Sequence, residues 1–123
     1  YSIAPAGQSK LVTCISGKVR DFFVDLRRDS DTYLKWGFVD LTSESGTSIY
    51  LGNGIGHGFQ ALEDSSTVAY LLDSEYQPDL EFAITPFDEQ LNINWPLSDF
   101  EISEKDKMAP SLSELSSRGK LPE

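Results

Sequence analysis

Short apolar stretches recur along this chain at close spacing, separated by polar or glycine-containing breaks. They are rich in Val, Ile, Phe, Tyr and Thr, the residue types that favour strands. The breaks, such as "SESG" and "GNGIG", have the composition of turns. This pattern predicts many short antiparallel strands, and hence an all-β sandwich, jelly roll or barrel. The predicted strands cover residues 9–15, 18–26, 33–41, 47–51, 57–62, 66–72 and 81–86.

The stretch "KVRDFFVDL" has an alternation that a dry core does not explain. As a strand it places Val19, Asp21, Phe23 and Asp25 on one face and mostly apolar side chains on the other. A solvated pocket inside a barrel would accept two carboxylates beside apolar side chains. The alternative is that this face is the wet side of the sheet.

The chain changes character after Phe87, where two prolines block long strands. A short helix is predicted near the end, because Ser111 and Glu114 have the S-x-x-E spacing of a capping box and the nearby leucines share one face. We expect a single domain over residues 1–118 and a frayed tail over residues 119–123.

Charge and composition narrow the possible partners. Ten Lys and Arg against twenty Asp and Glu give a formal net charge of −10, which disfavours nucleic acid and anionic membrane surfaces as partners. No apolar run reaches the roughly eighteen residues of a membrane span, and no secretion leader is visible. The single cysteine, Cys14, has no intrachain disulfide partner and is expected to be a buried, inert thiol. The expected location is the cytoplasm.

The chemistry-bearing residue types are sparse. One histidine, His57, and one cysteine make a transition-metal site built from this chain improbable, and no nucleophile motif is present. A lone histidine among glycines on a strand is more often a hydrogen-bonded structural ring than a catalyst. On composition alone, Tyr70 reads as a core residue, Lys10 as a lysine at a strand edge and "SEKDKMAP" as a solvated charge run.

Taken in order, several stretches resemble the dTDP-4-dehydrorhamnose 3,5-epimerases and the related dTDP-4-keto-6-deoxysugar epimerases of antibiotic sugar pathways. The resemblance extends from Tyr1 to about Leu115. The stretches that carry it are "GQSKLVTCISGKVRDFFVDLRRDSDTYLKW", "YLGNGIGHGFQAL", "VAYLLDSEYQPDLE", "LNINWPL" and "ISEKDKMAP".

The resemblance implies a cupin-like β jelly roll that binds no metal and needs no cofactor, and a homodimer acting on a dTDP-4-keto-6-deoxyhexose. The implied reaction removes a proton from carbon next to the 4-keto group and returns one to the opposite face, at C3, C5 or both. In the family the general base is a histidine of an R-G-x-H motif just before the aromatic that Tyr1 matches. On this basis the chain lacks the base and the N-terminal strands of the family domain.

The resemblance also assigns roles to residues. Tyr70 matches the tyrosine that delivers the proton opposite the base, and Lys10 matches the lysine that stabilises the enolate oxygen. Asp106 matches the carboxylate that pairs with the catalytic histidine. His57 matches a second histidine in the pocket, and Asp21 matches an acidic residue behind the site that holds it.

Two more residues are assigned to substrate binding. Lys105, next to Asp106, is expected to meet a phosphate, and Tyr76 belongs to a Y-x-P motif near the sugar or nucleotide rim. The sequence departs from the family pattern nearby, with Leu71 in place of a common lysine and Glu75 in place of a common aromatic. The rival interpretation is a catalytically inactive jelly roll that binds a sugar nucleotide.

Overall fold

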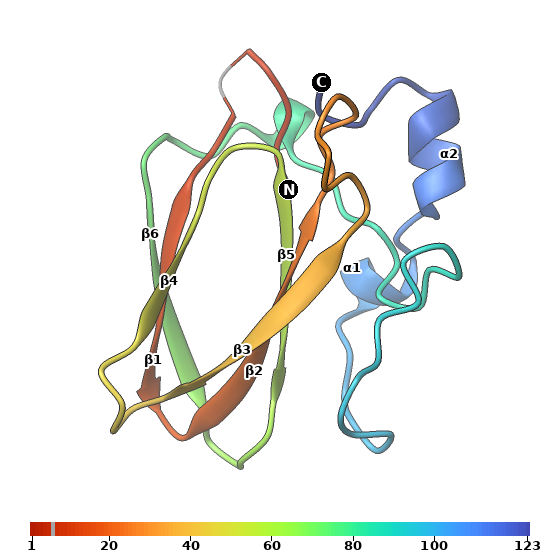
Figure 1. The fold of residues 1–123 in the computed structure, drawn as a ribbon. Helices are drawn as coiled ribbons and strands as arrows, with labels where there is room; N and C mark the ends of the chain where they lie inside the picture. The colour runs from red at the N-terminus through yellow and green to blue at the C-terminus, as the bar shows by residue number, and fades with distance from the viewer. Residues whose placement is uncertain (6) are drawn as a thin grey trace.

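Two three-stranded antiparallel sheets pack face to face in the computed structural model, which describes residues 1–5 and 7–123 (Figure 1). The first sheet has the order β4-β1-β6 and the second β3-β2-β5. The strands are β1 (Lys10–Ser16), β2 (Lys18–Asp25), β3 (Trp36–Thr42), β4 (Ser48–Leu51), β5 (Ile55–Ala61) and β6 (Thr67–Leu72). The 3₁₀ turn η1 (Pro78–Leu80) and the short helices α1 (Glu104–Lys107) and α2 (Leu112–Ser117) follow. The prediction of an all-β fold with a short C-terminal helix is confirmed.

The core between the sheets consists of inward-facing side chains from both of them. Val12 and Cys14 of β1 meet Val19 of β2, Leu41 of β3 and Leu51 of β4, and each is at most 5% exposed. Cys14 is a free, buried thiol, as predicted. The sandwich therefore has a dry centre, and β2 passes through it.

The outer face of the second sheet is also buried. Phe22, Val24 and Leu26 point away from the first sheet and are 2%, 6% and 0% exposed. The C-terminal segment covers them, and in Figure 1 it runs along this side of the molecule with α1 and α2. Its buried contributions are Leu91, Leu112, Leu115 and Leu121. Both faces of β2 are therefore buried.

The C-terminal helix forms as predicted, but the tail after it is packed. Ser111 and Glu114 make the reciprocal bonds of a capping box at the start of α2. The expectation of a frayed tail over residues 119–123 is wrong, because Leu121 is only 5% exposed. The carbonyl oxygen of Pro122 also accepts a hydrogen bond from the Arg28 backbone. An apolar side chain in the core and a backbone hydrogen bond to a distant loop fix the end of the chain.

Two strand predictions differ from the structure. Residues 81–86 form no strand, because their pairing stops after a single bridge between Ser2 and Glu81 and two backbone bonds between Tyr1 and Phe82. The third strand starts at Trp36 rather than residue 33, because the chain is still in a turn, with the preceding Leu34 at a φ of 62°. Both differences arise at places where the partner segment is distant or the backbone turns.

The face of β2 that carries its carboxylates is buried, so the alternative of a wet sheet surface is wrong. Asp21 is 0% and Asp25 5% exposed. The Asp25 carboxylate accepts hydrogen bonds from the Arg27 backbone and guanidinium and from the hydroxyls of Ser30 and Thr32. These bonds, led by that from Arg27, hold the pKa of Asp25 well below its usual range. Asp25 thus anchors the loop after β2, whereas Asp21 contacts His57 on the neighbouring strand β5.

None of the helices in the described part of the chain has the length and apolar character needed to cross a membrane.

Candidate active site

A broad cavity of about 990 Å³ runs along β5 and is bounded by β1 and β6 on one side and by parts of the 82–106 segment on the other. β5 and β6 are the edge strands of their sheets, so the sandwich is open between them. Lys10, His57, Tyr70 and Asp106 all line this cavity. These residues come from different parts of the chain, and the fold brings all four to one place.

The strand register explains why Lys10 and Tyr70 meet. On the antiparallel pair of β1 and β6, Lys10 lies opposite Leu72 and Val12 opposite Tyr70. Residues two apart on a strand share a face, so Lys10, Val12 and Tyr70 all project from the inner side of the sheet. Tyr70 is 53% exposed, so its interpretation as a core residue on composition alone is wrong.

His57 is held from behind by Asp21. On the pair of β2 and β5, His57 lies opposite Phe23, which makes Asp21 its diagonal neighbour on the same face. Nε2 of His57 lies 2.7 Å from Oδ2 of Asp21, and the two side chains are only 9% and 0% exposed. When Asp21 is a carboxylate it can only accept, so Nε2 carries the proton and Nδ1 is the ring nitrogen left for other contacts. The family resemblance implied that Asp21 holds His57, and the two side chains are in hydrogen-bond contact in the structure.

The glycines around His57 let other segments approach it. Gly54 has a φ of 81° in the turn before β5, where Ile55 N–H donates to the carbonyl of Gly52. Gly56 and Gly58 then point to the outer face of the sheet. A Cβ on Gly58 would lie 3.6 Å from Trp95, so the segment above packs directly on the strand that carries the histidine.

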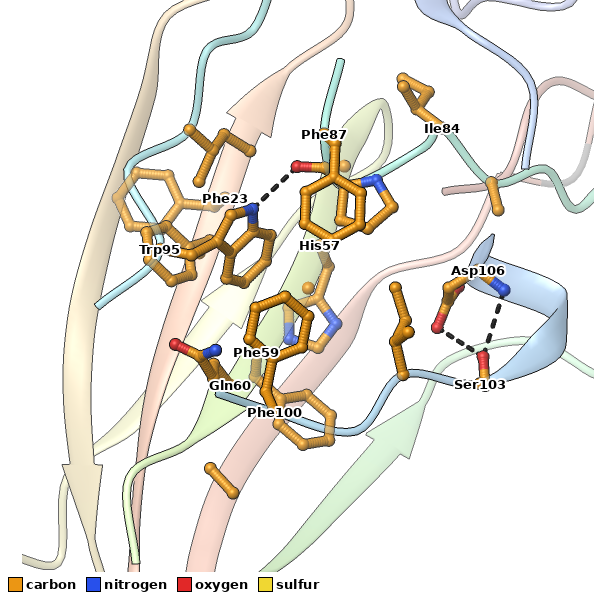
Figure 2. A pocket seen from close by; sticks show the side chains of 18 of the residues that line it. Phe23, His57, Phe59, Gln60, Ile84, Phe87, Trp95, Phe100, Ser103 and Asp106 are labelled. Carbon is orange, nitrogen blue, oxygen red and sulfur yellow. Dashed lines mark hydrogen bonds between the residues drawn. The ribbon is translucent and has the colours of Figure 1, made fainter. Parts of the chain in front are cut away.

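Asp106 reaches the cavity from a single helical turn. The Ser103 hydroxyl caps α1, accepting a bond from the backbone N–H of Asp106 and donating one of 2.7 Å to its Oδ2 (Figure 2). The segment "SEKDKMAP" is therefore not only a solvated charge run, because one of its carboxylates faces the cavity. The Ser103 bond occupies one oxygen of Asp106 and leaves Oδ1 for another partner.

Lys105 and Tyr76 do not line the cavity. Successive residues of a helix point about 100° apart, so the turn that aims Asp106 at the cavity directs Lys105 elsewhere. Tyr76 is 63% exposed in the loop after β6. Their assignment to substrate binding stays a prediction.

Several aromatic residues of the cavity were not selected by sequence reasoning. Phe59, Phe87, Trp95 and Phe100 line the cavity and are labelled in Figure 2, where Trp95 lies on the outer face of the sheet, opposite to the face of His57. The rings of Phe87 and Phe100 stack with centroids 5.8 Å apart. Phe59 could have been found, because it lies two residues after His57 on a strand and so shares its face. Phe87 and Phe100 lie in irregular segments, which have no periodicity that indicates the direction of a side chain.

The charged side chains that line the cavity are mainly acidic. Lys10 is the one lysine or arginine that lines it in residues 1–5 and 7–123, whereas its carboxylates are Glu63, Asp64, Asp99, Glu101 and Asp106. Over the same residues, no group of three or more His, Cys, Asp or Glu side chains is placed to hold a metal ion. Acid–base chemistry at carbon needs a cation or donor beside the developing oxyanion, and Lys10 supplies the positive charge available here.

The sequence of the chain is similar to that of one family of known proteins. The model of a family described as dTDP-4-dehydrorhamnose 3,5-epimerase matches residues 1–114. A dTDP-4-dehydrorhamnose 3,5-epimerase of Mycobacterium tuberculosis is 42% identical over 125 residues, covering 99% of this chain and 62% of that protein. A dTDP-4-dehydro-6-deoxyglucose 3-epimerase from a Streptomyces species is 39% identical and covers 99% of this chain and 63% of its own length.

Solved structures agree with the sequence relatives. A 4-keto-6-deoxy sugar epimerase from the novobiocin gene cluster of Streptomyces spheroides superposes with a TM-score of 0.95 at 41% identity, covering 99% of this chain and 61% of that one. A 3'-monoepimerase of Streptomyces bikiniensis, solved with dTDP-quinovose, gives a TM-score of 0.91 at 38% identity, over 99% and 62% of the two chains. The cupin-like jelly roll is thereby confirmed. The chain spans about three fifths of the length of these relatives.

Proposed function

Because the chain belongs to the dTDP-4-dehydrorhamnose 3,5-epimerase family, we propose that it forms the sugar end of an epimerase site for a dTDP-4-keto-6-deoxyhexose. The observation that carries the proposal is the convergence of Lys10, His57, Tyr70 and Asp106 on one cavity. Such an enzyme is an isomerase of deoxysugar biosynthesis. Some relatives are named as 3,5-epimerases and others as 3-epimerases, and the positions inverted here are left to experiment.

Lys10 and Tyr70 fit two requirements of the reaction: stabilisation of the enolate oxygen and return of a proton to carbon. A proton next to the 4-keto group leaves as the carbonyl oxygen becomes an enolate, and Lys10 is the cation available to stabilise that oxygen. Tyr70 projects from the same sheet face and is 53% exposed, so its hydroxyl is open to a ligand in the cavity. In the proposed mechanism it delivers the proton to the face opposite the base.

Asp106 and the pair of His57 and Asp21 support the remaining steps. In the family pattern the base is a histidine immediately before the position of Tyr1, and Tyr1 lines the same cavity as Asp106. Asp106 is therefore suited to orient that histidine and to favour its protonated form. His57, fixed by Asp21, is proposed to hydrogen-bond the sugar through Nδ1.

The diphosphate end of the substrate needs basic groups beyond this cavity. Lys10 alone cannot neutralise a diphosphate while it stabilises the enolate, and five carboxylates line the same space. We propose that Lys105, Tyr76 and residues of a homodimeric partner serve the nucleotide end. A nucleotide-sugar substrate is made and used inside the cell, which supports a cytoplasmic location. The inactive binding module is disfavoured by the named epimerase activities of relatives with about 40% identity.

The direct test follows hydrogen exchange in heavy water. The complete enzyme is incubated with dTDP-4-keto-6-deoxyglucose in D₂O, and deuterium at C3 and C5 is located by NMR. We expect exchange and inversion at one or both carbons, whereas exchange at neither carbon would leave the binding module as the better interpretation.

Two variants separate the proposed roles. Tyr70→Phe should retain exchange and lose inversion, because proton removal does not need the acid on the opposite face. Lys10→Ala should slow exchange itself by about 10²- to 10³-fold, because the enolate loses its cation. Tyr50→Phe and Lys35→Ala are matched controls, since both side chains are exposed and outside the cavity. Normal inversion by Tyr70→Phe, or unchanged exchange in Lys10→Ala, would contradict the respective role.

A further inference from the structure

We propose that Gln60 is a positioning residue, whose side-chain amide fastens residues 95–97 to the sheet and thereby sets the place of Asp106 at the cavity. Gln60 is on β5, three residues after His57, and points to the outer face of the sheet. It is a neutral polar residue that is only 9% exposed. A buried amide needs partners, and those of Gln60 are both on one residue of the covering segment.

The side-chain amide of Gln60 makes two hydrogen bonds with the backbone of one residue of the covering segment. Nε2 donates to the carbonyl oxygen of Leu97 at 3.1 Å, and the N–H of Leu97 donates to Oε1 at 3.0 Å. This reciprocal pair has the donor and acceptor pattern of a backbone bridge, but it joins the covering segment to the outer face of β5. The 95–97 segment is thus attached to the sheet in a fixed register.

Trp95 completes the attachment. Its ring packs on Phe22 with centroids 4.5 Å apart and lies against Gly58, next to His57. Its indole N–H donates to the carbonyl oxygen of Pro86 at 2.7 Å (Figure 2). Trp95 therefore fixes the segment laterally on the sheet, while Gln60 fixes its register along β5.

Between this attachment and Asp106 the chain is held by side-chain packing, chiefly the stacking of Phe100 on Phe87, rather than by hydrogen bonds. Within the described part of the chain, residues 98–102 make no hydrogen bond, and their polar side chains are exposed. On the far side of α1, Pro110 accepts a bond from the N–H of Thr85. Asp106 therefore lies between two points that hydrogen bonds attach to other parts of the fold, and the point on its N-terminal side is the bond pair of Gln60.

The first test reads hydrogen exchange of single amides in the chain with Gln60→Leu. Loss of both bonds should accelerate exchange at the amides of Lys107 in α1 and of Met108 and Ala109 directly after it by about 10- to 100-fold, while those of Leu115 in α2 and of its C-cap Arg118 keep their native rates. Gln90→Leu is the control, because Gln90 is exposed and its side chain makes no hydrogen bond within the described part of the chain. Native rates in α1, or equal acceleration in α1 and α2, would overturn the proposal.

The second test uses Gln60→Glu, which retains the shape of the side chain. A carboxylic acid copies both bonds of the amide only while it is protonated, since a carboxylate cannot donate to the Leu97 carbonyl. Exchange at the α1 amides should therefore resemble that of Gln60→Leu near pH 8 and return toward native rates as the pH falls toward 5, after division by the wild-type rate at each pH. A ratio that does not change with pH would contradict the two-bond attachment.

The expected effect of Gln60 on catalysis rests on the proposed function. The experiments distinguish a failure of the proposed function from a failure of the proposal about Gln60. In the complete enzyme, Gln60→Leu should lower kcat about 10- to 100-fold with little change in KM, because Asp106 loses its place while the strand residues of the cavity do not. Unchanged kcat with accelerated α1 exchange would overturn the link to Asp106. An inactive wild-type enzyme would refute the proposed function, and the exchange data would still decide whether Gln60 positions α1.

Discussion

Gly56 and Gly58 flank His57 on β5, and we predict that alanine has opposite effects at the two positions. A Cβ on Gly56 would lie 2.8 Å from Cγ1 of Val24 and 2.9 Å from Cδ1 of Leu26, both of which are buried. The nearest atom to a Cβ on Gly58 is Cη2 of Trp95 at 3.6 Å, an ordinary contact. The same substitution therefore overpacks one site and fits the other.

The magnitudes follow from packing and backbone entropy. Extra volume in a packed core costs about 1–3 kcal/mol, whereas alanine in place of glycine inside a strand gains roughly 0.5–1 kcal/mol. We expect Gly56→Ala to lower the free energy of unfolding by about 1–2 kcal/mol and Gly58→Ala to raise it by roughly 0.5 kcal/mol. The predicted difference between the two variants is about 2 kcal/mol.

Urea unfolding followed by tryptophan fluorescence measures this difference. With an m-value of about 1.5–2 kcal/mol/M, the two midpoints should differ by about 1 M. Gly58→Ala serves as the matched control, because it makes the same chemical change on the same face of the same strand. Equal midpoints for the two variants would refute the reasoning, because the contacts of Gly56 would then not resist an added methyl group.

Three further substitutions test other parts of the fold. Asp25→Asn should cost about 2–3 kcal/mol at pH 7, because the bonds from Arg27 favour the carboxylate. A carboxyl whose pKa is lower in the folded than in the unfolded state stabilises the fold at pH values above its unfolded-state pKa of about 3.9. The difference in urea midpoint between wild type and Asp25→Asn should therefore shrink below about pH 4. A difference that does not change with pH would contradict this. Leu115→Ala should cost about 2–5 kcal/mol, because the side chain is 2% exposed in the core under α2, and a thermal midpoint near the native value would disprove that packing role. Ser111→Ala should cost about 1 kcal/mol, because it removes the hydroxyl that accepts from the Glu114 N–H, and an unchanged urea midpoint would show that this cap is dispensable.

The strand pattern predicted the sandwich because its strands carry the β-branched and aromatic residues that pleated surfaces favour, although three of the four strand pairs in the described part of the chain join strands that are not consecutive. Residues 81–86 have the same composition, yet their pairing partner is the far end of the chain at Tyr1 and Ser2. Composition does not indicate whether such a partner is long enough to form a ladder. The tail at 119–123 was misjudged for a related reason, since the burial of Leu121 depends on a core assembled from distant segments.

In the candidate site, too, some residues could be placed from the sequence and others could not. The positions of Lys10, Tyr70 and Asp21 relative to their strands follow from period-two alternation, and their roles follow only from the family resemblance. Phe87 and Phe100 could not be predicted, because the irregular segments that carry them have no repeating direction. Gln60 was overlooked because a single glutamine in a strand gives no sign that it pairs with a backbone 37 residues away.

The double burial of β2 has a consequence for the order of folding during synthesis. The strands precede the segment that covers the outer face of β2, so Phe22, Val24 and Leu26 are exposed to solvent until residues beyond Leu91 have been made. Asp106 lies between Leu91 and Leu112, within the stretch whose leucines then close this second core. Closure of the core and placement of the proposed catalytic carboxylate are therefore linked, and a nascent chain that stops before α2 contains Asp106 but leaves the outer face of β2 incompletely covered.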